Sequence, residues 1–260
     1  TQGSYKYNAD TYSDGFATTF GAATTATGQP SIYLDYYVTD TYPTVTAGNT
    51  ISSTNINQYS PRYQEKMFYA AGRIWAFWTT SEMVAFLYQS YYSSSADNGV
   101  TWATPISVHA IGGELSGENL QAIYDETNNR VNVFARSPWL YYRSGTPNSD
   151  GSITWTADWI LFWNCGVSNV DFYAAIDSNS YPYVVWGFAA VMSNDECWVN
   201  KASTNDGTWI ANTAGYPLQL SNAGAGGYIN NNWLVPLKNG KLYAFYCKSE
   251  TAIKGRLYDG

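Results

Sequence analysis

Charged residues are scarce in this chain, and histidine and cysteine are scarcer still. Only 13% of the 260 residues are Asp, Glu, Lys or Arg, and 13 basic residues face 20 acidic ones. A nucleic-acid partner requires a basic face, which so few scattered cations cannot supply. No apolar run approaches the roughly 18 residues of a membrane-spanning helix. The composition therefore argues against nucleic-acid binding and predicts a chain that does not span a membrane.

Metal-binding residues are equally sparse. The single histidine, His109, and the three cysteines, Cys165, Cys197 and Cys247, have no metal-ligand spacing, so we expect no metal and no cofactor. The cysteines are either small buried apolar residues or include one disulfide, Cys165 with Cys197. His109 follows an expected outer strand without a serine or cysteine partner, which favours a surface position.

Aromatic residues, by contrast, make up 17% of the chain, and a tryptophan motif recurs in it. Its full form is Ser95-Ala-Asp-Asn-Gly-Val-Thr-Trp102, and weaker forms occupy Asp150–Trp155 and Asn205–Trp209. The three terminal tryptophans stand 53 and 54 residues apart. A fixed period near fifty residues indicates one supersecondary unit that is used several times.

Each period contains short runs of alternating aromatic, aliphatic and polar residues, bounded by Gly, Asn, Asp or Ser. Such runs predict antiparallel strands, and no window carries an apolar stripe at helical spacing. The expected first strands are Lys66–Tyr69, Leu120–Tyr124, Phe172–Ile176 and Trp233–Leu237; the third strands are Val84–Tyr92, Leu140–Arg143, Cys197–Lys201 and Ile253–Tyr258. With the motif in the last hairpin, the unit is a four-stranded meander, typical of a β-propeller blade.

The predicted fold class is therefore all-β, a propeller of four-stranded antiparallel blades. A period of about 53 residues gives about five blades, with four to six compatible, and the last blade is incomplete within the chain. We expect residues 59–260 to form the propeller. Residues 1–58, with plausible strands at Ser31–Thr39 and Thr50–Asn55, form either a degenerate blade or an extension.

The tryptophan motif resembles the Asp-box (BNR repeat) of sialidase-like β-propellers, Ser-x-Asp-x-Gly-x-Thr-Trp. The matching positions are Ser95, Asp97, Gly99, Thr101 and Trp102, then Asp150 and Trp155, then Asp206 and Trp209. In such a turn Asp accepts backbone N–H bonds, Gly supplies a positive φ and Trp packs into the blade. We interpret these positions as structural rather than calcium-binding or catalytic. Loss of Trp102 should cost about 3–5 kcal/mol, as for a buried Trp→Ala change. The resemblance implies that these turns lie away from the ligand cleft.

Ligands of propellers usually meet the face where the inner strands begin. The chain has polar residues at this point of each unit: Arg62, Gln64, Glu118, Asn119, Asn169, Asp171, Asn230, Asn231 and Asn232. Amides and carboxylates beside Tyr and Trp suit hydroxyl-rich, flat ligands such as glycans. The set therefore indicates either a solvated mouth or a glycan-binding site.

Sialidase catalysis, which the resemblance raises, requires three arginines that clamp a carboxylate, a Tyr–Glu pair and an Asp acid/base. The chain has six arginines, Arg62, Arg73, Arg130, Arg136, Arg143 and Arg256, and only Arg62 stands where the family's first arginine would lie. Since neither Lys nor Asn replaces a bidentate arginine, full sialidase catalysis is not expected. Another glycoside hydrolase would use two carboxylates, for which Glu118 and Asp171 are the candidates, with Glu114 in reserve.

The predicted function is a non-catalytic β-propeller at the cell surface or outside the cell. It would act as a surface, adhesive or filament-forming module, and its partners would be other protein subunits or cell-surface glycans. Incomplete blade edges favour self-assembly, because unpaired strands recruit other strands. The alternative is a carbohydrate-active hydrolase of sialidase-like fold.

Overall fold

The computed structural model describes most of the chain from Glu65 onward and two short strands before it. The described residues are 4–7, 24–27, 65–84, 87–108, 120–137, 139–156, 159–163, 170–188, 195–223, 232–248 and 252–258. The chain divides into two compact units, Thr1–Ala47 and Gly48–Gly260. In the first unit, β1 (Ser4–Tyr7) pairs antiparallel with β2 (Thr24–Thr27). The expected strands Ser31–Thr39 and Thr50–Asn55 lie outside the described residues, so the boundary at residue 58 stays a prediction.

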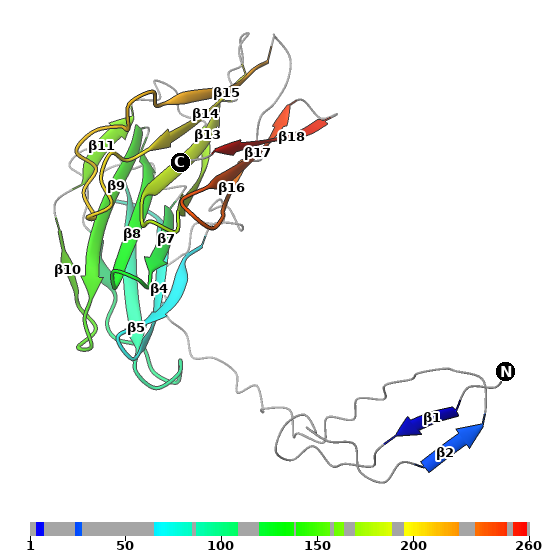
Figure 1. The fold of residues 1–260 in the computed structure, drawn as a ribbon. Coiled ribbons are helices and arrows are strands. Elements are labelled where there is room, and N and C mark those ends of the chain that lie inside the picture. The colour runs from blue at the N-terminus through cyan, green and yellow to red at the C-terminus, as the bar shows by residue number, and fades with distance from the viewer. Residues whose placement is uncertain are drawn as a thin grey trace. The chain divides into compact units, whose positions relative to one another are not determined.

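Four antiparallel sheets follow one another along the described part of the second unit, coloured from cyan to red in Figure 1. The first sheet contains β3 (Met67–Ala70), β4 (Arg73–Val84), β5 (Leu87–Ser95) and β6 (Ile106–Ser107). The second contains β7 (Leu120–Asp125), β8 (Arg130–Ser137), β9 (Trp139–Pro147), β10 (Ile153–Trp155) and β11 (Ile160–Trp163). The third contains β12 (Val170–Ile176), β13 (Pro182–Phe188), β14 (Asp195–Lys201) and β15 (Leu218–Ala223). The fourth contains β16 (Asn232–Pro236), β17 (Leu242–Lys248) and β18 (Ala252–Tyr258).

Strands that follow one another in the chain are mostly hydrogen-bonded neighbours in these sheets. This is the meander that the sequence period predicts, and the described residues contain no helix. The all-β architecture of antiparallel, four-stranded sheets is thus confirmed. The number of blades and the closure of a propeller ring stay predictions.

The outer edge of the second sheet differs from the expected single fourth strand. Two short strands pair with β9, β10 along Gly145–Pro147 and β11 along residues 140–142. A register shift between Leu161 and Trp163 marks an irregularity in β11. β10 and β11 therefore lie in line along one edge of β9 and together form an interrupted fourth strand, with the tryptophan motif at the end of β10.

Both faces of the second and third sheets are buried, because alternate side chains point to opposite neighbours. In β8, Val131 and Val133 lie in the core cluster shared with the first sheet, whereas Phe134 lies in the cluster shared with the third. In β13, Trp186 belongs to that same cluster with the second sheet, and Val185 belongs to the cluster shared with the fourth. Each pair of adjacent sheets thus encloses one core of its own.

The first strands of the sheets, β3, β7, β12 and β16, form a continuous inner edge in which each contacts the next. β7, β12 and β16 run in the same direction, since the turns at their far ends meet. The Asn128 amide donates to the Ser180 hydroxyl at 2.7 Å, and the Gly240 N–H donates to the Ser178 hydroxyl at 2.7 Å. The beginnings of these strands therefore gather at the opposite end.

One buried amide joins two of the inner strands. Gln121 in β7 is fully buried, and its Nε2 donates to the Ala174 carbonyl in β12 at 2.9 Å. The Ala174 N–H donates back to Gln121 Oε1 at 2.8 Å. The Gln121 side chain thus makes the two hydrogen bonds that the backbone of a paired strand would make. β7 and β12 themselves are not paired in one sheet.

We expect Gln121→Met to lower the free energy of unfolding by roughly 2–5 kcal/mol, because it leaves the N–H and carbonyl of Ala174 buried without partners. Urea titration followed by tryptophan fluorescence measures the loss. Gln219→Met, at a half-buried position in β15, is the matched control. A loss no larger than that of the control would contradict the bridging role.

Candidate functional site

The polar residues predicted to bind a ligand precede the inner strands or begin them. Arg62, Gln64, Glu118, Asn119, Asn169, Asn230 and Asn231 lie outside the described residues, as do Glu114 and His109. Asp171 is described only by its backbone in β12, which pairs with Gly187. β7, β12 and β16 begin at one end of the unit, at Leu120, Val170 and Asn232.

Asn232, the first residue of β16, is the described member of this polar set. Its side chain is 2% exposed, and its Oδ1 accepts a hydrogen bond from the Cys197 thiol at 3.2 Å. Its Nδ2 is buried and has no partner among the described residues. A buried donor without an acceptor is uncommon and indicates a place where a ligand oxygen or a water is accommodated.

Cys197 is a free thiol, so the structure does not contain the alternative disulfide with Cys165. Burial raises the pKa of the Cys197 thiol well above its usual range. The thiol therefore stays protonated, donates to Asn232 and is a poor nucleophile.

A second group of titratable residues, which the sequence reasoning missed, lies along the inner edge. The Glu65 carbonyl accepts the Ala122 N–H at 2.8 Å, which places Glu65 and Lys66 beside β7. Loss of water around them raises the pKa of Glu65 and lowers the pKa of Lys66 to about 8. Burial, and then the nearby Glu65 carboxylate, raise the pKa of Tyr173 in β12. In the sequence, Glu65 and Lys66 are marked only by their position at the start of the first inner strand.

The Asp-box-like turns, 95–102, 148–155 and 204–209, lie after the third strand of the first three sheets. In the first turn, Asp97 Oδ1 accepts the Thr101 N–H at 2.8 Å, and Oδ2 accepts the Thr101 hydroxyl at 2.6 Å. The Ser95 hydroxyl donates to Asp97 Oδ1 and accepts the Gly99 N–H at 2.8 Å. The carboxylate thus closes the turn through internal hydrogen bonds.

The other two turns repeat this carboxylate role with fewer bonds. Asp150 Oδ1 accepts the N–H and hydroxyl of Ser152 at 2.8 and 2.7 Å. Asp206 Oδ1 accepts the N–H and hydroxyl of Thr208 at 2.9 and 2.6 Å. Hydrogen bonds from the Thr101 side chain and backbone lower the pKa of Asp97 to about 2, and the Ser152 and Thr208 bonds lower the pKa of Asp150 and Asp206.

Arginines connect each sheet to a turn or loop of its neighbour. Arg73 at the start of β4 donates to the Ser149 carbonyl at 3.2 Å, and Arg130 at the start of β8 donates to the Asn205 carbonyl at 2.8 Å. Arg143 in β9 donates to the Val108 carbonyl beyond β6 at 2.7 Å. Three of the six arginines therefore bind backbone carbonyls between sheets rather than clamp a ligand carboxylate.

The tryptophans of the second and third Asp-box-like turns pack onto the preceding sheet. Trp155 lies edge-on to Tyr92 of the first sheet, with ring centroids 6.2 Å apart. Trp209 is 2% exposed and stacks on Phe162 of the second sheet at 4.3 Å. Trp102 is only half-buried, contrary to the expectation of a buried ring. The cost of a buried Trp→Ala change thus applies to Trp209 rather than to Trp102.

Two further properties bear on the chemistry of the chain. The described residues contain no group of three or more His, Cys, Asp or Glu side chains that would hold a metal ion. Within the same residues no helix is long and apolar enough to cross a membrane.

No protein-family model matches the chain, and no curated protein matches it. Among solved structures, the chain is similar to an α-L-arabinofuranosidase from Podospora anserina in complex with cellotriose, with a TM-score of 0.48 and 13% identity over 82% of this chain and 68% of that one. A thermostable family-43 glycoside hydrolase gives 0.45 and 13% over 83% and 72%. A leech intramolecular trans-sialidase gives 0.43 and 15% over 75% of this chain and only 30% of its own length.

These neighbours are carbohydrate-active hydrolases of β-propeller fold. At TM-scores below 0.5 the similarity carries no argument about what this chain binds or does.

We expect Gly207→Ala to destabilise the chain more than Gly99→Ala, by roughly 1–3 kcal/mol. Both glycines have a φ near +90°, +92° for Gly207 and +90° for Gly99, so the backbone strain is matched. A Cβ on Gly207 would lie 2.7 Å from Arg130 Nε and from Ser144 Oγ, whereas a Cβ on Gly99 meets nothing within 4 Å. Equal decreases in melting temperature for the two variants would show that the close contact of Gly207 with Arg130 and Ser144 contributes nothing to stability.

The turn aspartates predict a pH-dependent stability. Because the folded-state pKa of Asp97 is lowered from 3.8 to about 2, its stabilisation is present above pH 3.8 and is lost as the pH falls through about 2. The difference in urea midpoint between the wild type and Asp97→Asn should therefore be present at pH 5 and shrink below pH 3.8. Glu126→Gln, in the exposed β7–β8 turn, is the control. A difference that does not change with pH contradicts the assignment.

Proposed function

We propose that this chain is a non-catalytic, extracellular β-propeller module that binds glycans where its inner strands begin. The observation that carries the proposal is the common direction of β7, β12 and β16, read from the Asn128–Ser180 and Ser178–Gly240 bonds at their far ends. With that direction, we expect the polar positions before each strand to lie at one end of the unit.

The chemistry of this end suits a neutral, hydroxyl-rich ligand. Asn119, Asn169 and the 230–232 run supply amides that donate and accept hydrogen bonds. Asn232 has a buried Nδ2 donor without a partner in the described part of the chain. Tyr173 adds a half-buried aromatic ring, and flat sugar faces pack on such rings.

A non-catalytic role agrees with the use of the arginines. Arg73, Arg130 and Arg143 bind backbone carbonyls between sheets and are not available to clamp a carboxylate. Low charge and abundant Tyr, Thr and Asn further favour a surface, adhesive or filament-forming module outside the cell or on its surface. Its partners would be cell-surface glycans or other protein subunits.

One observation favours the second candidate, a glycoside hydrolase. Glu65 has a raised pKa and lies on the same inner edge as Asp171. A general acid requires a carboxyl with a raised pKa and a second carboxyl across the cleft. Glu118, Asp171 and Glu65 are the residues that such an activity would use.

Glycan-array binding of the full chain, followed by calorimetry on any ligand found, tests the proposal. Asn119→Ala should weaken binding by roughly tenfold, the loss of one hydrogen bond to a sugar hydroxyl. Tyr173→Ala should also weaken it, because it removes the ring on which a sugar face packs. Glu126→Gln, at the opposite end of β7, should leave binding unchanged. Absence of binding to the array contradicts the proposal. Hydrolysis of aryl glycosides that disappears in Glu118→Gln or Asp171→Asn would replace it with the hydrolase.

A further inference from the structure

The fourth sheet ends on its third strand, β18. In the other three sheets the third strand pairs on its outer side with a further strand: β5 with β6, β9 with β10 and β11, and β14 with β15. β18 pairs with β17 along all seven of its residues, and no strand of the described residues pairs with its other side. The backbone N–H and carbonyl groups on that side are therefore open to another strand.

One face of β18 carries a row of hydrogen-bond donors. Alternate residues of a strand point to the same face, and on this face they are Lys254, Arg256 and Tyr258. The Lys254 and Arg256 side chains are exposed and make no hydrogen bond or ion pair with any described residue. The Tyr258 hydroxyl is buried and has no hydrogen-bond partner among those residues either. Three donor groups along one open strand edge thus lack an acceptor.

The opposite face of β18 is apolar. It carries Ile253, which is 75% exposed, and Leu257, which is 51% exposed, with Gly255 between them. The Tyr243 ring already lies so close over Gly255 that no Cβ fits there. A strand beside β18 would therefore meet apolar side chains on one face and donors on the other.

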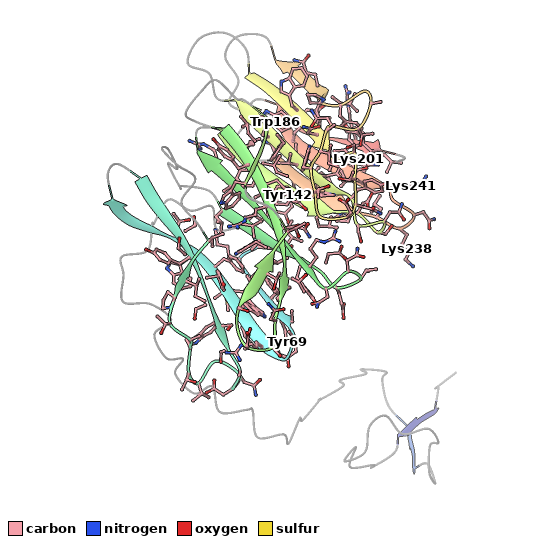
Figure 2. The ribbon with its side chains drawn as sticks, turned by 90° about the vertical axis from the view of Figure 1, so that its left-hand side faces the viewer. Tyr69, Tyr142, Trp186, Lys201, Lys238 and Lys241 are labelled. Atoms are coloured by element: carbon pink, nitrogen blue, oxygen red, sulfur yellow. The ribbon has the colours of Figure 1, made fainter. Side chains whose placement is uncertain are left out.

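Basic residues gather in the fourth sheet. The chain has a net charge of −7, yet it has no acidic residue between Asp206 and Glu250. Lys238 and Lys241 lie at one end of the fourth sheet, on the same side of the unit as Lys201 of the third (Figure 2). Five of the 13 basic residues lie between positions 232 and 258, where Glu250 is the one acidic residue: Lys238, Lys241, Lys248, Lys254 and Arg256. A basic sheet in an acidic chain favours an anionic partner at that sheet.

The chain itself does not supply a matching strand. Two β18 strands paired antiparallel in full register would place Lys254 opposite Arg256, and like charges directly opposite each other destabilise a strand pair. Carboxylates that face Lys254 and Arg256 together stand two positions apart in a strand. No two acidic residues of this chain have that spacing. The complementary strand therefore belongs to a different protein.

We propose that β18 receives an extended segment of a partner protein in which acidic and apolar residues alternate. The segment lies antiparallel to β18, as the fourth strands of the other sheets lie beside their third strands. Its carboxylates face Lys254 and Arg256, and its apolar side chains pack on Ile253 and Leu257. Main-chain hydrogen bonds give an added strand its affinity, and alternate side chains give it selectivity. This surface is separate from the glycan-binding end, and the inference does not depend on that end.

Fluorescence anisotropy of labelled peptides with the full chain tests the proposal. A peptide of about eight residues that alternates glutamate and valine should bind, whereas one that alternates lysine and valine should not. Arg256→Glu and Lys254→Glu should each weaken binding on the order of tenfold, since each replaces attraction with repulsion. Lys238→Glu is the matched control. It makes the same change of charge in the exposed β16–β17 turn and should bind as the wild type does.

Three further peptides separate strand pairing from attraction between charges. One has the same composition with the glutamates and the valines in adjacent pairs, and two are N-methylated along one edge or the other. Strand pairing requires the alternation and one edge with free N–H groups, so the first peptide and one of the methylated peptides should lose binding. Equal binding by all of them overturns the proposal in favour of a general polyanion surface. It is also overturned if the alternating peptide does not bind, or if Arg256→Glu and Lys254→Glu leave its binding unchanged.

Discussion

The constraint on which this structure depends is that an apolar strand buried on both sides needs two neighbouring sheets. β8 and β13 alternate between residues that pack backward and residues that pack forward, such as Val131 with Phe134 and Val184 with Val185. Neither sheet has a solvent-facing side in the way that an ordinary antiparallel sheet does. Stability therefore arises at the interfaces between sheets, and each sheet is incomplete alone.

Polar groups reinforce those interfaces at the end of the unit where the inner strands finish. Asp97, Asp150 and Asp206 close the turns after the third strands, while Arg73 and Arg130 bind the carbonyls of the next turn. These charged side chains therefore stabilise the fold. The ends where inner strands begin carry amides and carboxylates that no such pattern requires, and binding residues concentrate on segments that a rigid scaffold positions.

Local chemistry explains how much of this was predictable. Turn residues and alternation predicted β7 to within one residue, Leu120–Tyr124 against Leu120–Asp125, because both signals are local. The bridge by Gln121, the pKa shifts of Glu65 and Lys66, and the partial burial of Trp102 depend on which sheet lies beside them. No short stretch of sequence contains that information. The candidate carboxylate Glu118 lies outside the described residues and stays a prediction.

The difference between local signals and contacts with neighbouring sheets also explains why the sequence period predicts the structure of each sheet but not how many sheets there are. The interfaces of the second sheet follow one rule: Phe77 or Phe134 lies on the face that the next sheet packs against, and the tryptophan of that next sheet's turn joins the same core. Nothing in that rule refers to how many sheets have already been stacked. The period therefore predicts the sheet and its interface with the next sheet, and it carries no information on the number of sheets.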